Sequence, residues 1–481
     1  MIRPHHGLWV CAVSLACGDA GTESASMSGG STTSLTGPST GPSTGSPTSS
    51  ATDTPTTTAT GAEGTGSGSA TTGTAATTGS TTGATSTTGP VTATDAQTTS
   101  ATTTTSPDTT GDPDTGTGTT GEGCPDIGGG DVEFSFIWIA NSPDGTVSKI
   151  DTQTLKEVGR YWVRPQGGGE PSRTSVNLRG DVVIGSRLGG VTKIFARPED
   201  CKESNGMPGI QTSTGKNNVL PWGVEECIAW YADYSFTSER AVAWTTGDLD
   251  MQTCEFTDPK VWIGATADAI NLKVMLLGGD DGKEDASVVI PGTTGYMTRS
   301  PYGAAVDAEN DVWMVNAYCG GTMIEVHQDM TYETIKVPGE VCPYGIAVDS
   351  GGYVWIGGYQ TYTGRYDPVS KGWDLVQAQG LGIQEDAKGR LWLGAYGSNA
   401  VIEIDGDTLQ VLSTTAVPTT GQSKGVSIDF YGYVWIVSDA GNTAVRLDPV
   451  TKAFQTYAGL NDPYSYSDMT GWGLKNAVIP Q

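Results

Sequence analysis

An apolar motif of three residues, most often centred on Trp, recurs seven times between residues 134 and 440. Continuous apolar triplets are expected for short strands that are covered on both faces. The last five Trp centres are separated by 51, 42, 37 and 43 residues, and a repeat of this length built of short strands is typical of a β-propeller, one blade per repeat. The seven triplets are Ile137-Trp138-Ile139, Val182-Val183-Ile184, Val261-Trp262-Ile263, Val312-Trp313-Met314, Val354-Trp355-Ile356, Leu391-Trp392-Leu393 and Val434-Trp435-Ile436.

The residues around the triplets complete a blade of four strands. Ahead of the Trp lies a strand that ends at an Asp, as in 302–307, 344–349, 381–386 and 424–429. The Asp side chain can accept hydrogen bonds from the amides of the following turn. After the Trp, a third strand ends at another Asp-containing turn, in which Pro often follows the Asp, and the outermost strand comes next.

The number of strands at the two ends of the repeat region predicts how the ring closes. The first repeat, at residue 134, lacks an innermost strand, and 471–478 reads as an innermost strand without a blade of its own. Joining the two removes the open edges of the ring. We therefore predict an all-β, seven-bladed β-propeller over 124–481 that is closed by the C-terminal strand. Insertions at 197–226 and 247–258 lengthen the second and third repeats.

The N-terminal quarter of the chain has a different composition. Residues 1–17 contain about ten consecutive apolar or small residues, too few to span a bilayer as a helix, which indicates a signal peptide. Ala16-Cys17 resembles the cleavage site of bacterial lipoproteins, so Cys17 is the candidate lipidation site. Residues 18–123 are rich in Thr, Ser and Gly and contain no aromatic or basic residue. We predict that this tract is a disordered linker, since it has almost no apolar surface to bury.

This N-terminus predicts an exported protein, held by its lipid at the outer membrane or cell surface; a secreted or periplasmic protein is the alternative. Six cysteines follow the signal peptide, and an even number in an oxidising compartment indicates up to three disulfides. The spacing favours Cys319–Cys342 and then Cys201–Cys227, which leaves Cys124–Cys254. No C-x-x-C pair or histidine at ligand spacing is present, so we expect no structural zinc.

The charge of the chain excludes one class of partner. The formal net charge is −27 and the isoelectric point is near 4.3, with no cluster of basic residues. Such a chain has nothing to neutralise phosphates, so we expect no nucleic-acid binding.

The repeated pattern Pro-Tyr-Gly-Ile-x-x-Asp, followed by Gly-x-Val-Trp-Ile, resembles the virginiamycin B lyase family of seven-bladed propellers. The resemblance implies a carbon–oxygen lyase that opens cyclic esters with Mg²⁺ and the histidines of Pro-His pairs at the channel mouth. Here Tyr302 and Tyr344 stand at those positions, and a phenol is a poor general base near neutral pH. After the signal peptide, His327 is the one histidine, and it is expected in a turn at the rim. We therefore predict no catalytic residue, no metal site and no cofactor; Mg²⁺ belongs to the lyase alternative.

The loops that converge on the channel mouth supply the candidate ligand-binding residues. Tyrosines with Arg and Lys around a concavity suit stacking on a ring or sugar and pairing with an anionic group. The alternative is that these tyrosines only pack between blades. We expect a surface-tethered, non-catalytic monomer that binds a small molecule, a glycan or a partner protein. The candidates are Arg173, Arg187, Arg299, Tyr302, Asn316, Tyr344, Tyr359, Tyr396, Lys424 and Trp472.

Overall fold

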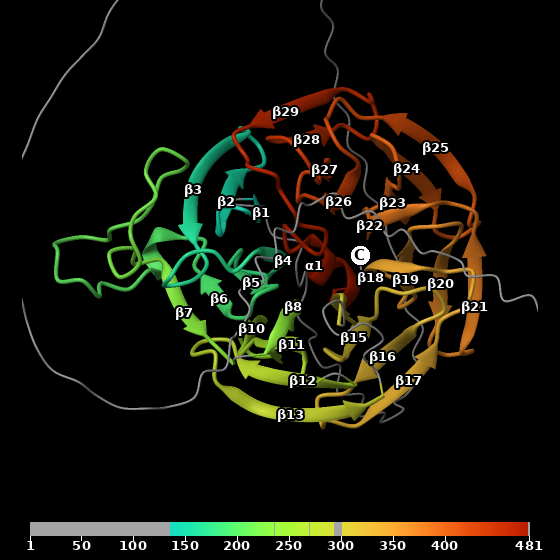
Figure 1. Ribbon diagram of the computed structural model, residues 1–481, viewed down its shortest axis with the longest axis horizontal. Helices are drawn as coiled ribbons and strands as arrows, with labels where there is room; N and C mark the ends of the chain where they lie inside the picture. Colours follow the sequence, from blue (N-terminus) through green and yellow to red (C-terminus); the bar gives the residue numbers. More distant parts are fainter. Residues whose placement is uncertain (1–134, 235, 269, 293–300, 480–481) are drawn as a thin grey trace, which may run out of the picture. The chain divides into compact units, whose positions relative to one another are not determined.

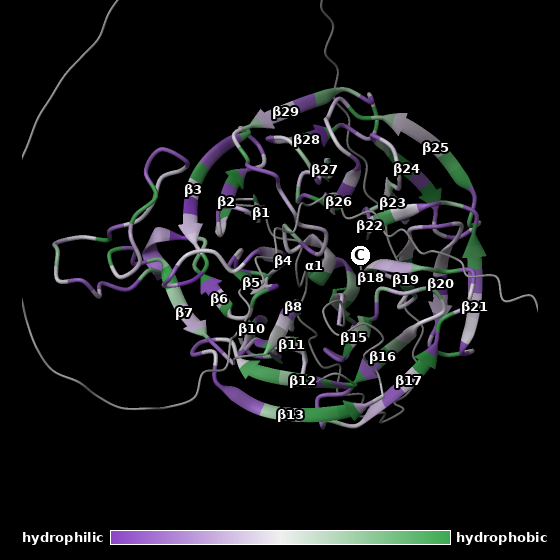
Figure 2. Cartoon of the chain, in the orientation of Figure 1, coloured by the Kyte–Doolittle hydropathy of each residue, from purple (hydrophilic) through white to green (hydrophobic). Residues whose placement is uncertain are grey.

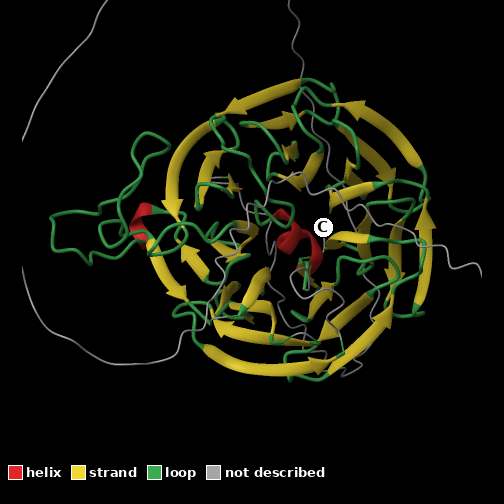
Figure 3. Cartoon of the chain, viewed as in Figure 1, coloured by secondary structure: helices red, strands yellow, loops and turns green. Residues whose placement is uncertain are grey.

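A computed structural model describes residues 135–479 except 235, 269 and 293–300. Seven β-sheets are arranged radially around a central channel, so the fold is the predicted seven-bladed propeller (Figures 1 and 3). Residues 1–134, and with them the predicted signal peptide, linker, Cys17 and Cys124, lie outside the described residues, as does Arg299. Within the described part of the chain, no helix is long and apolar enough to cross a bilayer.

The strands follow one another from the channel outward in most blades. Blade one holds β1 (Phe136–Asn141), β2 (Thr146–Asp151) and β3 (Lys156–Trp162), and blade two holds β4 (Pro171–Val176), β5 (Val182–Ser186), β6 (Val191–Ile194) and β7 (Ile228–Ala232). Blade three holds β8 (Thr237–Trp244), β11 (Lys260–Thr266), β12 (Asn271–Gly278) and β13 (Glu284–Pro291), and blade four holds β14 (Gly303–Val306), β15 (Val312–Val315), β16 (Thr322–Val326) and β17 (Tyr332–Lys336).

The last three blades have the same layout. Blade five holds β18 (Pro343–Val348), β19 (Val354–Gly358), β20 (Thr363–Asp367) and β21 (Gly372–Val376), and blade six holds β22 (Gly380–Glu385), β23 (Arg390–Ala395), β24 (Ala400–Asp405) and β25 (Val411–Ala416). Blade seven holds β26 (Ser423–Ile428), β27 (Val434–Ser438), β28 (Thr443–Leu447) and β29 (Phe454–Ala458). Hydrophilic residues recur on outermost strands such as β3 and β13 (Figure 2). Several residues of these strands are exposed to solvent.

The Trp triplets form the second strand of each blade, except that blade two has Val183 in place of Trp. All six of these Trp side chains are buried between neighbouring blades. In blades four to seven, the predicted turn Asp holds both the turn and the Trp. Asp429, for example, accepts the amides of Tyr431 and Tyr433 on Oδ1 and the indole N–H of Trp435 on Oδ2. The same contacts recur at Asp307, Asp349 and Asp386.

The ring is closed by C-terminal residues, although not by the segment that the sequence indicated. Pro463 pairs with Asn141, the amide of Tyr464 donates to the carbonyl of Ala140 (3.0 Å), and the amide of Trp138 donates to the carbonyl of Met469 (2.9 Å). Residues 463–469 thus lie antiparallel to β1, in the innermost position of blade one. We call them the closing segment.

The predicted innermost strand 471–478 is wrong, because these residues form the helix α1 (Trp472–Val478) inside the ring (Figure 3). The closing segment already occupies the free edge of β1. The carboxylate of Asp468 then accepts the amides of Thr470, Gly471 and Leu474, which holds the start of the helix. Gly471 has a φ of 87°, a left-handed conformation that turns the chain from the closing segment into α1.

Two of the predicted disulfides are present. Cys201–Cys227 ties the first insertion, which contains the short helix η1 (Pro198–Asp200), back to blade two, and Cys319–Cys342 links blades four and five. Cys254 is also disulfide-bonded and lies in the second insertion, the hairpin of β9 (Asp248–Asp250) and β10 (Glu255–Thr257). Disulfides are typical of extracytoplasmic proteins.

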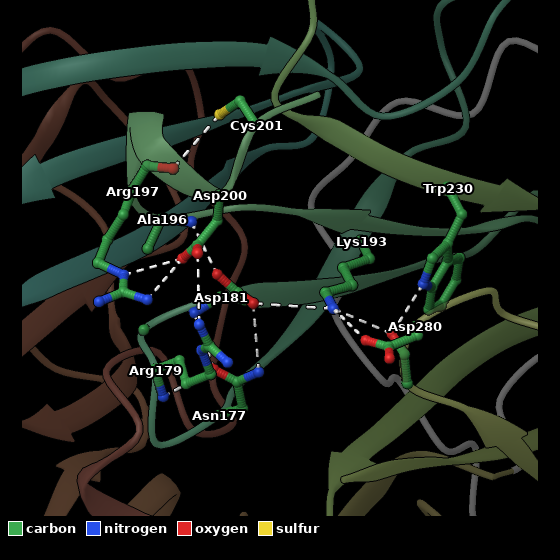
Figure 4. A network of polar contacts seen from close by, with 12 residues as sticks. Asn177, Arg179, Asp181, Lys193, Ala196, Arg197, Asp200, Cys201, Trp230 and Asp280 are labelled. Carbon is green, nitrogen blue, oxygen red and sulfur yellow. Dashed lines mark hydrogen bonds and ion pairs between the residues drawn. The ribbon is translucent and has the colours of Figure 1, made fainter. Parts of the chain in front are cut away.

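A buried polar network joins blades two and three beside the first insertion (Figure 4). Lys193 Nζ donates to the carbonyl of Gly279 (3.0 Å) and lies 3.7 Å from Asp181 and 3.8 Å from Asp280. Asp181 also accepts the amide of Ala196, next to the insertion. Burial lowers the pKa of Lys193 and raises that of Asp181, as expected where two charges are taken out of water.

Candidate functional site

The innermost strands all begin at the same end of the channel, which we call the channel mouth. Four tyrosines and one leucine meet there and form the tyrosine cluster: Tyr302, Tyr344, Leu381, Tyr464 and Tyr466. The rings of Tyr344 and Tyr466 are 4.5 Å apart, and those of Tyr302 and Tyr344 are 5.0 Å apart. The hydroxyl of Tyr464 shares hydrogen bonds with those of Tyr344 (2.9 Å) and Tyr302 (3.3 Å).

The Gly that follows Tyr in the repeat explains how the strands approach so closely. A Cβ at Gly345 would lie 2.5 Å from the carbonyl oxygen of Leu381 in the next blade. The side chain of Tyr344 can therefore turn into the channel while the backbones of blades five and six remain in contact.

The tyrosine cluster is poorly suited to remove a proton. Tyr302 and Tyr344 are 4% and 8% exposed, and burial raises the pKa of both phenols above the ordinary value of 10. Both side chains therefore stay protonated near neutral pH, and a protonated phenol can donate a hydrogen bond but cannot act as a base.

Two buried guanidinium groups flank the tyrosine cluster. Those of Arg173 on β4 and Arg240 on β8 lie 4.7 and 4.8 Å from the ring centre of Tyr302, and Arg173 also lies against the ring of Tyr466. Burial lowers the pKa of Arg173 to about 9, which still leaves the side chain charged at neutral pH. Arg240 donates to Ser238 Oγ (2.9 Å).

Two further cations, one buried and one partly exposed, lie against Tyr464 at the mouth. Lys424 Nζ lies 3.3 Å from Asp439 and 4.3 Å from the ring centre of Tyr464. Arg187 lies 4.7 Å from the same ring centre and pairs with Glu170 (3.2 Å). The mouth thus combines aromatic faces with positive charge, although the chain as a whole is strongly acidic.

A pair of tyrosines forms the accessible edge of the mouth. The rings of Tyr359 and Tyr396, from blades five and six, are 6.0 Å apart, and Tyr396 is 37% exposed. The hydroxyl of Tyr359 lies 3.8 Å from the sulfur of Cys319, so the Cys319–Cys342 disulfide borders this pair. Such rings offer flat faces for stacking.

The structure brings together most of the residues that the sequence singled out. Arg173, Arg187, Tyr302, Tyr344 and Lys424 contact the tyrosine cluster or belong to it. Tyr359, which is partly buried, and Tyr396, which is exposed, form the tyrosine pair at the edge, and Asn316 is buried at the end of β15.

Trp472 lies apart from these residues. It is on α1, where its indole donates to the carbonyl of Glu385 and packs against Phe430. Glu385 is the last residue of the innermost strand β22 and Phe430 comes just after β26, so Trp472 is at the opposite end of the channel.

The sequence reasoning missed Arg240, Tyr464 and Tyr466. The alternation in Tyr464-Ser465-Tyr466 is a strand pattern that could have indicated the closing segment. Nothing in the sequence around Arg240 marks it as a channel residue, because blade three lacks the Tyr-Gly motif.

Between the mouth and α1, the channel holds a cavity of about 40 Å³. Its polar lining comes from Ser175, Gln384, Ser467 and Asp468. This space accommodates a few water molecules but no organic ligand.

His327 lies on blade four, away from the tyrosine cluster. Its Nδ1 is 2.5 Å from Asp311 Oδ2, and this hydrogen bond raises the pKa of the imidazole. With Glu325, these two residues form the one group of metal-ligand type among the described residues, with ligand atoms within 4.8 Å of one another. The geometry is that of a partly exposed ion pair beside a carboxylate.

Comparison with known proteins supports the fold but gives no family. No protein-family model and no curated protein matches the chain. Among solved structures, a functionally unknown protein from Desulfotomaculum acetoxidans is similar, with a TM-score of 0.50 and 11% identity over 69% of this chain and 97% of that one. Virginiamycin B lyase from Staphylococcus aureus is similar with a TM-score of 0.43 and 16% identity over 61% and 87%. AztD from Citrobacter koseri has a TM-score of 0.44 and 11% identity over 71% and 99%.

Proposed function

We propose that this protein is a ligand-binding propeller whose site is the channel mouth, and that it binds without catalysing a reaction. The observation that carries the proposal is the gathering of aromatic rings and cations at that end of the channel, next to the pair of Tyr359 and the exposed Tyr396. Aromatic faces and a few convergent polar groups are the usual composition of a small-molecule or glycan site.

The alternative, a metal-dependent lyase acting on cyclic esters, has less support. Its general base would have to be Tyr302 or Tyr344, and the raised pKa of both phenols opposes that role. The proposal includes no cofactor. We further propose that the protein is exported, carries a lipid anchor at Cys17 and is a monomer. The disulfides Cys201–Cys227 and Cys319–Cys342 support only the proposal of export.

Thermal-shift titration of the full chain tests the site. The probes are neutral oligosaccharides, aromatic carboxylates and sugar phosphates. We expect at least one probe to raise the melting temperature of the wild type, and Tyr359→Ala or Tyr396→Ala to abolish that shift. Tyr332→Ala is the matched control, since Tyr332 is 41% exposed on β17, away from the mouth.

Two outcomes would overturn the proposal. One is that no probe shifts the wild type, and the other is that the shift survives both mouth substitutions. Release of an opened ring from a cyclic ester, lost in Tyr302→Phe, would replace it with the lyase.

A further inference from the structure

One edge of the Arg173 guanidinium has no hydrogen-bond acceptor. Nη1 donates to Ser172 Oγ (2.9 Å) and to the carbonyl of Ser172 (3.3 Å). Nε and Nη2 are buried and have no partner among the described residues. In a guanidinium these two N–H groups point the same way from one edge of the plane, which is the edge that binds an oxyanion through two parallel hydrogen bonds.

The surroundings of this edge contain no described carboxylate that could serve as its counterion. Asp439 is paired with Lys424, and Glu170 is paired with Arg187. Burial is the main cause that lowers the pKa of Arg173, and the neighbours that act on it are Tyr302, then the second cation Arg240, and then two further tyrosines, with no carboxylate among them. Arg173 lies against the ring of Tyr466, and the buried hydroxyl of Tyr466 also has no hydrogen-bond partner within the part of the chain that the structure describes.

An arrangement of this kind is costly for the free protein. Arg173 is 1% exposed, and burying a cation without a counterion is unfavourable, although its contacts with Ser172 and the aromatic rings offset part of that cost. Buried polar groups in native proteins are nearly always paired. A binding partner that supplies negative charge and two acceptor atoms would remove this cost.

The guanidinium is also held in one orientation. Ser172 fixes the Nη1 end, and the guanidinium lies against the ring of Tyr466 and beside that of Tyr302. Because the plane is fixed, the acceptor atoms must lie in that plane beside Nε and Nη2. Carboxylate, phosphate and sulfate groups meet this requirement with two oxygens, whereas a chloride ion offers one point of contact.

We propose that the free Nε–Nη2 edge of Arg173 binds an oxyanion of the ligand, a carboxylate or a phosphate or sulfate group, with the Tyr466 hydroxyl as a further donor. The inference rests on the proposed function, since it assigns the chemical class of the ligand that the channel mouth takes. The pair of Tyr359 and the exposed Tyr396 would then contact the remainder of the ligand.

Thermal melting of the full chain with acetate, inorganic phosphate and sulfate tests the inference, with sodium chloride at the same ionic strength as the reference. We expect at least one oxyanion to raise the melting temperature above the chloride reference, by about 4 °C at 100 times its dissociation constant. The order of the three anions identifies which oxyanion the site prefers.

Arg173→Met and Arg173→Lys are the informative variants. Arg173→Met removes the charge, and Arg173→Lys keeps the charge but lacks the two parallel N–H donors. We therefore expect both variants to lose the oxyanion-specific shift in melting temperature. In chloride alone, Arg173→Met should melt at or above the wild-type temperature, because it removes an unpaired buried charge. Arg446→Met is the matched control: Arg446 is also buried, but its guanidinium donates to the carbonyls of Thr152 and Gln153. This control should melt several degrees lower and keep the shift.

The inference is overturned if no oxyanion exceeds chloride, or if Arg173→Met keeps the shift. It is also overturned if Arg173→Met melts well below the wild type in chloride, since Arg173 would then be a structural residue. Binding of a neutral sugar that depends on Tyr396, without any oxyanion effect, would retain the proposed function and remove this inference alone.

Discussion

The contact between the turn Asp and the blade Trp makes a quantitative prediction at Asp429. Its side chain is fully buried and accepts three hydrogen bonds, from the amides of Tyr431 (3.0 Å) and Tyr433 (3.0 Å) and from the indole of Trp435 (2.8 Å). Asp429→Ala leaves all three donors without an acceptor. A hydrogen bond to a charged group contributes about 1.5–3 kcal/mol, and the cost of burying the carboxylate offsets part of the loss. We expect a net destabilisation of about 4 kcal/mol.

Asp429→Asn separates the two roles of the carboxylate, which accepts hydrogen bonds from the turn amides and from the indole of Trp435. The amide oxygen can still accept the two backbone amides, but the NH₂ group then faces the indole N–H of Trp435, which leaves one donor unpaired. This variant should lose about 2 kcal/mol. For a propeller of this size, a loss of about 0.7 kcal/mol in the free energy of unfolding lowers the melting temperature by about one degree. The melting temperature should therefore fall by about 6 °C for Asp429→Ala and by about 3 °C for Asp429→Asn.

Differential scanning calorimetry of the full chain measures both variants against a control in the same blade. Asp448 also accepts two turn amides, those of Val450 and Thr451, but its hydrogen bonds are exposed to solvent. Asp448→Ala should therefore cost less than about 1 kcal/mol. The reasoning fails if Asp429→Ala melts within a degree of the wild type, or if Asn and Ala are equally destabilising.

Three further predictions concern pH, a disulfide and the C-terminal helix. Burial raises the pKa of Asp307 from 3.8 to about 6, so the folded state holds this proton more tightly than the unfolded state does. The free energy of unfolding should therefore fall as the pH rises from about 4 to about 6, and urea titrations should show that Asp307→Asn flattens this part of the profile. Replacing both Cys201 and Cys227 by Ser opens a loop of 26 residues and should cost about 3.5 kcal/mol by calorimetry; an unchanged melting temperature would contradict the loop-closure argument. Trp472→Ala removes a side chain that is 5% exposed on α1 and should cost about 4 kcal/mol in the same assay, whereas a peripheral helix would lose less than 1 kcal/mol.

The repeat of Trp triplets and turn Asp residues explains why the fold could be predicted from the sequence. The strand pairing of each triplet such as Val434-Trp435-Ile436 spans fewer than fifteen residues, the contact of a turn Asp such as Asp429 with its Trp spans six, and these patterns recur from blade to blade. The spacing also predicted the disulfides Cys201–Cys227 and Cys319–Cys342, because each closes a short loop between adjacent elements. These patterns are local in sequence, and the triplet and the turn Asp recur several times along the chain.

The channel mouth was only partly predictable. The Tyr-Gly motif placed Tyr302 and Tyr344 at the mouth, since every innermost strand begins there. It gave no sign of Arg240 or Tyr466, which come from a blade and a segment that lack the motif. It also could not show that, among the residues the structure describes, two nitrogens of Arg173 have no hydrogen-bond partner. Pairing within a buried cluster depends on which side chains from several blades meet at one point.

The sequence by itself determined the number of blades, the strand order within them and the place of their turns, because these follow from patterns of two to about fifty residues. The tertiary structure decided which C-terminal residues close the ring. Residues 463–469 reach β1 from more than 300 positions away, and α1 forms because that edge is already occupied. Whether residues 463–469 or 471–478 pair with the edge of β1 depends on how closely each segment packs there, and this cannot be predicted from the periodicity of the sequence.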